Sequence, residues 1–395
     1  MILGGARYIL PVIEMAHDLG CHVITCDYLP ENIAHKYSDE YSNISIIDKD
    51  AVLEEAERLN IDGIMSFACD PGVTTAAFVA EKMGLPSAGP YESVLTLQNK
   101  GRFRRFLKEN GFNVPFAKSY QSVEHALKER DVFRWPVIVK PTDSAGSKGV
   151  KKVCSADELE NCIRYALSFS HCGEFIIEDF LQQHGYSSDS DFFSVDGVLQ
   201  FSSFNCQRFD ERAENPFTPS AYSWPASLSA ASQSELRSEI QRLITLLNLK
   251  TSIYNIETRE CTDGEAYIME CSPRGGGNRL AEMIRYSTGV NLIRNSVKAA
   301  LGEEITGVVQ NPQKGVWAEI ILHSTHPGVF KELLISNEIK NYIVETDIWA
   351  EPGMKVGGFS GANEAIGTLI FRFDSVSSME QVLLHQDQYI KVIVE

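Results

Sequence analysis

The sequence has 395 residues, of which 44% are hydrophobic and 23% charged. This composition is ordinary for a globular protein, and the length predicts two to four subdomains. The net charge of −17 argues against sequence-independent binding of DNA or RNA, which depends on clustered lysine and arginine. Neither a membrane-length apolar run nor a signal-peptide pattern is visible. We therefore expect a cytoplasmic protein with no nucleic-acid or membrane partner.

The first 95 residues alternate short apolar strands with amphipathic helices. Ile2-Leu3, His22–Asp27 and Gly63–Phe67 read as strands, and Val73–Met83 reads as a helix. This alternation predicts a parallel sheet with helices on its faces. The first strand looks short.

A second unit follows the turn-rich segment Gly84–Pro90. Lys100–Asn110 has a helical pattern, and a strand ending at Lys140 leads through a loop to a helix over Ala156–Phe169. A further strand covers Phe175–Glu178. We expect these elements to form a compact subdomain.

The loop Lys140–Val150 has the composition of a phosphate-binding segment. Small residues let backbone N–H groups approach phosphate oxygens, and Lys140 supplies a fixed positive charge. The spacing fits neither the Walker A motif nor the Rossmann fingerprint, and a mobile surface hairpin is the alternative. The candidate phosphate contacts are Lys140, Ser144, Gly146, Ser147 and Gly149.

A candidate adenine-binding segment lies 38 residues after Lys140. A strand that runs straight into a linker can offer backbone N–H and C=O groups to an adenine edge. An ordinary strand end is the alternative interpretation. The residues concerned are Glu178, Asp179, Phe180 and Leu181.

Two carboxylates mark a candidate metal site. Tyr254–Glu257 and Ala266–Glu270 flank an Asp-Gly turn, so we predict an antiparallel hairpin with Glu257 and Glu270 on adjacent strands. Mg²⁺ prefers hard oxygen ligands and often uses one or two carboxylates plus substrate phosphates. A surface carboxylate pair is the alternative, but both acids lie within apolar strands, where an unpaired charge is costly.

Arg274 follows the second carboxylate by four residues, and its planar fork suits a phosphoryl group or a carboxylate. Gly275, Gly276 and Gly277 would let substrate approach the backbone, and Asn278 precedes a helix predicted over Arg279–Tyr286. The tail after about residue 315 contains several β-rich runs. His323 and His326 lack nearby residues that would complete a zinc site.

Together these residues resemble the ATP-grasp superfamily over essentially the whole chain. Lys100, Lys140, the Ser144–Val150 loop and the Glu178–Leu181 segment match the family's nucleotide-binding positions. Glu257 and Glu270 match its metal ligands, and Arg274 matches its catalytic arginine. The resemblance implies an α/β and α+β fold with a pre-ATP-grasp domain (1–95), a linker helix and lid subdomain (96–189), a metal-bearing subdomain (190–305) and a β-rich C-terminal subdomain (306–395).

The sequence departs from the family pattern at two places. Ser272 stands where the Glu-x-Asn-x-Arg pattern has asparagine, so the metal is expected to rest mainly on Glu257 and Glu270. The acid that holds the ribose is assigned to Asp191, with Asp189 and His184 as rivals. Arg208, Gly275, Gly276 and Asn278 are assigned to the substrate by analogy.

The resemblance implies a carboxylate–amine ligase that is closest to amino-acid ligases and to carbamoyl-phosphate-synthase-like or phosphoribosylglycinamide-synthetase-like proteins. Its cofactors would be ATP and Mg²⁺, with Mn²⁺ as the alternative metal. ATP would convert a small carboxylate to an acyl phosphate, which an amine captures, releasing ADP and phosphate. A non-catalytic nucleotide-binding protein and a biotin-carboxylase-like enzyme are the alternatives. A homodimer is expected from the family.

Overall fold

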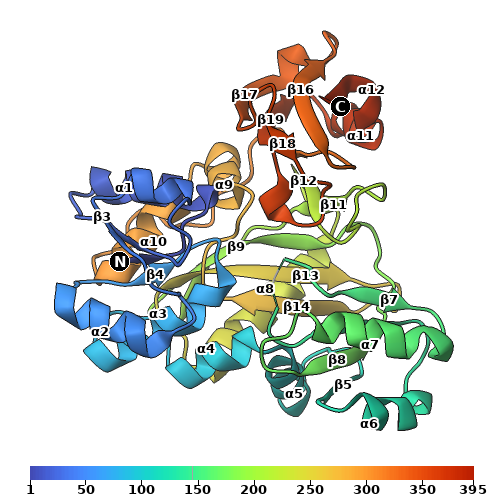
Figure 1. The fold of residues 1–395 in the computed structure, drawn as a ribbon, viewed down its shortest axis with the longest axis horizontal. Helices are drawn as coiled ribbons and strands as arrows, with labels where there is room; N and C mark the ends of the chain where they lie inside the picture. The colour runs from blue at the N-terminus through green and yellow to red at the C-terminus, as the bar shows by residue number, and fades with distance from the viewer. Residues whose placement is uncertain (145) are drawn as a thin grey trace.

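The computed structural model describes residues 1–144 and 146–395. Ala145, in the predicted phosphate loop, lies outside them. Figure 1 shows an N-terminal α/β domain on one side, two antiparallel sheets in the middle and lower part, and a C-terminal β-rich part above them. No helix within the described ranges is long and apolar enough to span a membrane.

The N-terminal domain has the parallel sheet that the sequence predicts. Its strands, in the order β3-β2-β1-β4, are all parallel neighbours. Leu3, Ile24 and Val79 are among the residues that form an apolar core between sheet and helices. The strands are β1 (Ile2–Leu3), β2 (Ile24–Cys26), β3 (Glu40–Ser42) and β4 (Met65–Ser66), and the helices are α1 (Leu10–Asp18), α2 (Lys49–Leu59) and α3 (Asp70–Met83).

Two helices, α4 (Tyr91–Gln98) and α5 (Lys100–Glu109), connect this domain to the next sheet. The Asn99 side chain caps α5 by accepting a hydrogen bond from the Arg102 N–H. The buried face of α5 includes Phe103 and Arg104. The buried arginine indicates that α5 carries a charge into the interior.

The next subdomain is an antiparallel sheet in the order β5-β8-β6-β7. Val137, Ile163 and Phe175 are members of its apolar core. It consists of β5 (Ala117–Tyr120), β6 (Val137–Pro141), β7 (Lys151–Val153) and β8 (Phe175–Asp179), with helices α6 (Val123–Lys128) and α7 (Leu159–Leu167).

The central sheet has the order β10-β9-β13-β14 and contains the predicted hairpin. Strands β13 and β14 are antiparallel, and Glu257 lies directly opposite Glu270. Helix α8 packs on this sheet through Leu236, Ile240 and Leu243. The elements are β9 (Ser188–Val195), β10 (Val198–Phe201), α8 (Ala230–Leu246), β13 (Ser252–Glu260) and β14 (Ala266–Ser272).

A five-stranded antiparallel sheet, in the order β11-β12-β15-β19-β17, joins strands from both sides of the boundary predicted near residue 305. A smaller sheet, β18-β16-β20, lies beyond it. The strands are β11 (Cys206–Phe209), β12 (Pro219–Trp224), β15 (Val316–Leu322), β16 (Gly328–Ile335), β17 (Ile343–Ile348), β18 (Lys355–Val356), β19 (Gly367–Phe373) and β20 (Ile390–Val394). The helices are α9 (Leu280–Thr288), α10 (Leu292–Leu301), α11 (Val376–Leu384) and α12 (Gln386–Tyr389).

The segment after β14 is locked to the N-terminal domain at Gly275. The Gly275 carbonyl accepts a hydrogen bond from the Ala68 N–H at 3.0 Å. A Cβ added at Gly275 would overlap the ring of Phe67, which is 3% exposed. Glycine is therefore required here for close packing between domains.

We predict that Gly275→Ala lowers the free energy of unfolding by about 1–3 kcal/mol, because the methyl group must displace the buried Phe67 ring. Gly277→Ala is the matched control, since a Cβ there would lie 3.8 Å from Ala68 and 3.9 Å from Tyr8. Urea unfolding of both variants measures the difference. Equal stability of the two variants would contradict this view of the interface.

Candidate active site

The two predicted metal carboxylates face each other on adjacent strands, and each is paired with a cation. Glu257 accepts from Arg259 at 2.7 Å, and Glu270 accepts from the Lys100 Nζ at 3.2 Å. Burial raises the pKa of Glu257, but the adjacent Arg259 guanidinium outweighs this and lowers it below the ordinary value. Glu257 is therefore a carboxylate at neutral pH.

The donor set fits Mg²⁺ bound together with phosphate oxygens. Glu257 and Glu270 supply hard oxygen atoms, and within residues 1–144 and 146–395 no group of three histidine, cysteine or acidic side chains could hold a metal alone. Ser272 is 2% exposed and engaged elsewhere: it donates to Asp70 at 2.8 Å and accepts from Gln98 at 2.8 Å. The metal would thus complete its coordination with phosphate and water.

A buried ion cluster fixes Lys140. Its Nζ donates to Glu178 at 2.5 Å, and the other carboxylate oxygen accepts from Arg104 at 2.9 Å. Burial opposes ionisation of Glu178, but the charges of Arg104 and Lys140 outweigh it and lower its pKa to about 2. One terminal nitrogen of Arg104 is buried without a hydrogen-bond partner. The cluster therefore holds two cations in place with one carboxylate.

The predicted phosphate loop is in contact with Lys100. Lys100 Nζ donates to the Ser144 carbonyl at 2.9 Å. Ser147 donates through Oγ to the Phe217 carbonyl at 2.8 Å, so this side of the loop is tied to the segment before β12. Gly146 and Gly149 have φ angles of 65° and 74°, which favour glycine.

Only some backbone groups of the predicted adenine segment are available to bind a ligand. The N–H of Asp179 donates to the Phe116 carbonyl, and that of Phe180 donates to the Pro136 carbonyl. Those two donors are thus used by the fold, and the Glu178 side chain belongs to the ion cluster. Leu181 is the first residue of the segment whose N–H is unused within the described chain.

Arg274 is held by Asp70, the first residue of α3, in a bidentate ion pair with distances of 2.8 and 2.6 Å. Its third nitrogen donates to Asn255 Oδ1 at 3.1 Å. Burial opposes ionisation of Asp70, but the Arg274 charge lowers its pKa below the ordinary value. No spacing pattern in the sequence points to Asp70, which lies 204 residues from its partner Arg274.

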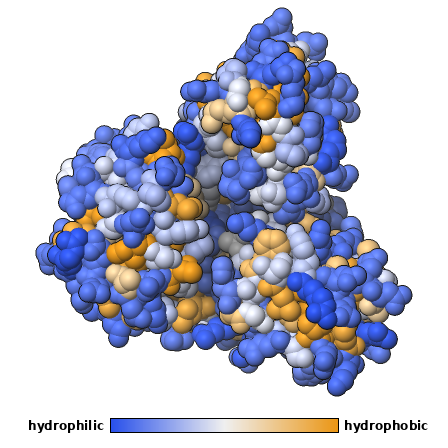
Figure 2. Space-filling view, viewed as in Figure 1, coloured by the Kyte–Doolittle hydropathy of each residue, from blue (hydrophilic) through white to orange (hydrophobic). Residues whose placement is uncertain are grey.

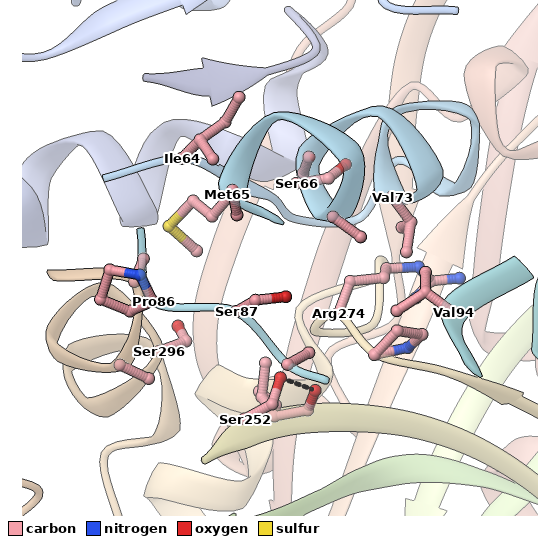
Figure 3. Close-up of a pocket in the computed structure, with 18 of the residues that line it drawn as sticks. Ile64, Met65, Ser66, Val73, Pro86, Ser87, Val94, Ser252, Arg274 and Ser296 are labelled. Carbon is pink, nitrogen blue, oxygen red and sulfur yellow. Dashed lines mark hydrogen bonds between the residues drawn. The ribbon is translucent and has the colours of Figure 1, made fainter. Parts of the chain in front are cut away.

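Figure 3 shows Arg274 at the edge of a small cavity that is also lined by Ser87 and Ser252. The cavity has a volume of about 70 Å³. Small-molecule sites usually occupy roughly 300–1,000 Å³. This cavity is therefore a packing defect between domains, and it is too small for a nucleotide. A larger hollow is visible in Figure 2, where the three parts of the molecule meet.

Asp191, assigned to the ribose, lies away from the linker that follows the predicted adenine segment. Asp191 lies opposite Asn255, and its carboxylate accepts from the Gly276 N–H at 2.8 Å. The linker after the predicted adenine segment instead runs beside Cys261, with which Gln183 forms an isolated antiparallel β-bridge. Cys261 lies six residues after Asn255 along the chain, which corresponds to roughly 20 Å at ~3.3 Å per strand residue. Asp189 is likewise on the Asn255 side, whereas His184 lies on the linker, its N–H bonded to the Glu260 carbonyl.

Arg208, assigned to substrate by analogy, is engaged by other parts of the fold. Its guanidinium pairs with Glu380 of α11 at 3.1 and 2.5 Å and donates to Ser223 at 3.1 Å. The Tyr186 ring lies 4.1 Å from the guanidinium carbon. Through these contacts Arg208 ties α11 to β11.

Close packing around Gly275 and Gly276 argues against their predicted contact with substrate. Gly275 contacts Phe67, and a Cβ at Gly276 would lie 2.6 Å from Leu280 and 2.8 Å from Asn255. Side chains of the protein occupy the space beside the Cα atoms of both glycines, so no space is left there for substrate. Asn278, in contrast, has a buried Oδ1 without a hydrogen-bond partner.

Part of the chain matches a known domain family. Residues 133–282 match the ATP-grasp domain model. The chain contains an ATP-grasp domain. This confirms the sequence-based resemblance, and the match spans the Lys140–Glu178 cluster, the two predicted metal carboxylates and Arg274. The sequence signal for Arg104 and Asp70 was absent because each acts through a long-range partner.

Proteins similar to this chain include the carbamoyl phosphate synthase large chain of Thermotoga neapolitana, 25% identical over 249 residues that cover 63% of this chain and 21% of that protein. The corresponding protein of Halomonas eurihalina is 23% identical over 89% of this chain and 33% of its own length. This chain therefore spans about a fifth to a third of the length of these relatives.

Two solved structures share the fold over the full chain. The L-amino acid ligase of Bacillus licheniformis has a TM-score of 0.81 at 20% identity, with 100% of this chain and 98% of that chain covered. Phosphoribosylglycinamide synthetase of Anaerococcus prevotii has a TM-score of 0.77 at 21% identity, with the same coverage. The mixed α/β ATP-grasp fold predicted from the sequence is confirmed.

We predict that Glu178→Gln costs about 3–5 kcal/mol of unfolding free energy at pH 7, because it leaves Lys140 and Arg104 buried without a counter-charge. The carboxylate contributes stability above its unfolded pKa of ~4.5, and that contribution is lost as the pH falls toward 2. The variant should thus lose less stability than the wild type across this window. Urea unfolding at several pH values measures both effects. Identical pH profiles would refute the assignment.

We predict that Asp70→Asn reduces turnover at least tenfold and changes the KM for ATP by less than threefold, because it releases Arg274 but leaves Lys100 and Lys140 in place. Asp62→Asn, at an exposed acid of the same domain, is the matched control. Steady-state kinetics of both variants gives the comparison. An unchanged kcat for Asp70→Asn would show that Arg274 needs no partner.

Proposed function

We propose that this protein is an ADP-forming carboxylate–amine ligase that uses Mg²⁺ and ATP. The observation that carries the proposal is the convergence of opposed carboxylates and fixed cations at one place. Glu257 and Glu270 face each other, and Lys100 bridges Glu270 and the phosphate loop. Such a set suits the positioning and charge stabilisation that phosphoryl transfer needs.

Each group in the cluster has a task in this mechanism. Lys100 and Lys140 bind phosphate oxygens, and Glu178 holds Lys140 in place. Mg²⁺, when bound, offsets the charge that develops on the phosphates. Arg274 orients the substrate carboxylate and stabilises the transferring phosphoryl group, and Asp70 positions Arg274 from the neighbouring domain.

The reaction proceeds in two steps. A carboxylate oxygen of the substrate attacks the γ-phosphorus, the bond from that phosphorus to the β,γ-bridging oxygen breaks, and ADP leaves. The amine nitrogen then attacks the acyl carbon, phosphate leaves with the bonding electrons, and the nitrogen loses a proton. The products are an amide, ADP and phosphate. The glycine-containing loop around Gly146 and Gly149 excludes water from the acyl phosphate.

The second candidate is a nucleotide-binding protein without turnover. Ser272 favours it, because this side chain binds Asp70 and Gln98 and supplies no metal ligand. We favour the ligase, since Glu257 and Glu270 retain the two carboxylates that Mg²⁺ often uses.

The test is phosphate release from Mg-ATP against a matrix of carboxylates, with amino acids foremost, and amines, with ADP and AMP resolved. We expect ADP and phosphate only when both partners are present. Formation of AMP and pyrophosphate would contradict the mechanism. Tight nucleotide binding without release in any mixture would favour the second candidate.

We predict that Glu270→Ala lowers turnover at least a hundredfold and weakens the dependence on Mg²⁺ concentration. Removing this carboxylate takes away one of two protein ligands to the metal. Glu92→Ala, at an exposed acid whose side chain forms only a surface pair with Arg102, is the control. Full turnover of Glu270→Ala would show that the metal assignment is wrong.

A further inference from the structure

The C-terminal part of the molecule contains a second cavity, with a volume of about 320 Å³. This volume falls within the roughly 300–1,000 Å³ that small-molecule sites occupy. The cavity lies between the segment after β11, the loop between β15 and β16, and the segment of α12 and β20. Figure 1 shows α12 well apart from β13 and β14, which carry the predicted metal carboxylates. The polar residues that line the cavity include Asp210, Arg212, His323, His326, Asp387 and Lys391.

The two acids in this wall already have cationic partners. Asp210 accepts from the Arg212 guanidinium at 3.0 and 3.1 Å, and its Oδ2 lies 3.4 Å from His323 Nε2. Burial raises the pKa of Asp210, but hydrogen bonds from His323 and Arg212 outweigh this effect and lower the pKa well below its ordinary value. The third guanidinium nitrogen of Arg212 pairs with Asp387 at 3.3 Å. The carboxylates are therefore satisfied by the protein.

Two donors in the wall have no such partner. The ammonium group of Lys391 forms no ion pair or hydrogen bond within the described part of the chain. The Nδ1 atom of His326 lies 3.3 Å from the Thr325 hydroxyl, and its Nε2 has no partner among the same residues. A lysine ammonium binds anions as a point charge, and an imidazole N–H can add a hydrogen bond. The unused groups of this cavity thus suit an anion.

The same cavity also has an apolar side. Leu322 and Ile390, which are 1% and 6% exposed, line it together with Val392. Small-molecule sites commonly combine apolar walls with a few polar groups that orient the ligand. The lining therefore fits a small organic molecule that carries an anionic group better than it fits a bare ion.

A chain of contacts joins this cavity to the predicted phosphate loop. The His323 ring stacks on Phe359 at a centroid distance of 4.0 Å. The Phe359 carbonyl accepts from the Asn215 N–H at 3.1 Å, and the Asn215 side chain donates to the Ser147 carbonyl at 3.3 Å. A ligand that packs against His323 can therefore influence the position of Ser147 in the loop.

We propose that this cavity is an effector site for a small organic anion, either a phosphate monoester or a carboxylate, whose binding favours the loop position that holds nucleotide. Lys391 and His326 bind the anionic group, and Leu322 and Ile390 contact the apolar body. By linkage, the nucleotide must raise the affinity for the effector by the same factor as the effector raises the affinity for nucleotide. The proposal concerns binding alone and does not depend on the ligase reaction.

The first test is calorimetric titration of the whole protein with phenyl phosphate and with benzoate. Saturating Mg²⁺ and a non-hydrolysable ATP analogue keep the cations of the candidate active site occupied. We expect at least one of the two anions to bind at least tenfold more tightly than phenol, their uncharged counterpart. Comparison of the two affinities identifies the preferred anionic group.

Lys391→Gln should weaken binding of that anion at least fivefold, because it removes the point charge and keeps most of the side chain. His326→Ala is the second test variant and should weaken binding about threefold or more. Lys355→Gln is the matched control, since Lys355 is an exposed lysine of β18 that does not line the cavity. It should bind the anion within about twofold of the wild type. Circular dichroism establishes that each variant is folded.

The second test measures the affinity for the ATP analogue with and without the bound anion. We expect the anion to raise this affinity at least twofold in the wild type and to leave it unchanged in Lys391→Gln. Asn215→Ala should still bind the anion but lose the effect on nucleotide affinity, because it removes the hydrogen bond to Ser147.

Three results would overturn the effector site. The first is that neither anion binds at millimolar concentration, and the second is that binding is unchanged in both folded test variants. The third is binding that depends on Lys391 but leaves the affinity for the ATP analogue unchanged.

Discussion

The ion pair between Asp70 and Arg274 is the constraint on which the active site depends. Asp70 begins a helix of the N-terminal domain, and Arg274 follows the metal-bearing hairpin. Because a bidentate pair fixes both distance and orientation, it sets where the guanidinium can meet a substrate. The Gly275 contact with Phe67 holds the same two segments together. The reactive arginine is thus positioned by the domain interface and not by its own strand alone.

Charge balance explains the rest of the arrangement. Lys140 and Arg104 share Glu178, Lys100 pairs with Glu270, and Arg259 pairs with Glu257. Only the Glu178 pairs are deeply buried, and breaking a buried pair of this kind costs several kcal/mol.

The sequence predicted what depends on local pattern. The parallel N-terminal sheet, the hairpin that opposes Glu257 and Glu270, and the strand–loop unit at Lys140 follow from periodicity and turn residues. Asp70 and Arg104 could not be found in this way, because their roles arise from partners far away in the chain. The position of Asp191 is set in a related way, because the register between β9 and β13 places it opposite Asn255.

The most direct test of the account follows the oxygen atoms of the carboxylate. A mixture of amino acids with both carboxylate oxygens enriched in ¹⁸O is incubated with the protein, Mg-ATP and the amine partner, and the released phosphate is analysed by mass spectrometry. An acyl-phosphate mechanism predicts one ¹⁸O atom in each phosphate, because the attacking oxygen leaves with phosphorus. Unlabelled phosphate, or ¹⁸O appearing in AMP, would contradict the account.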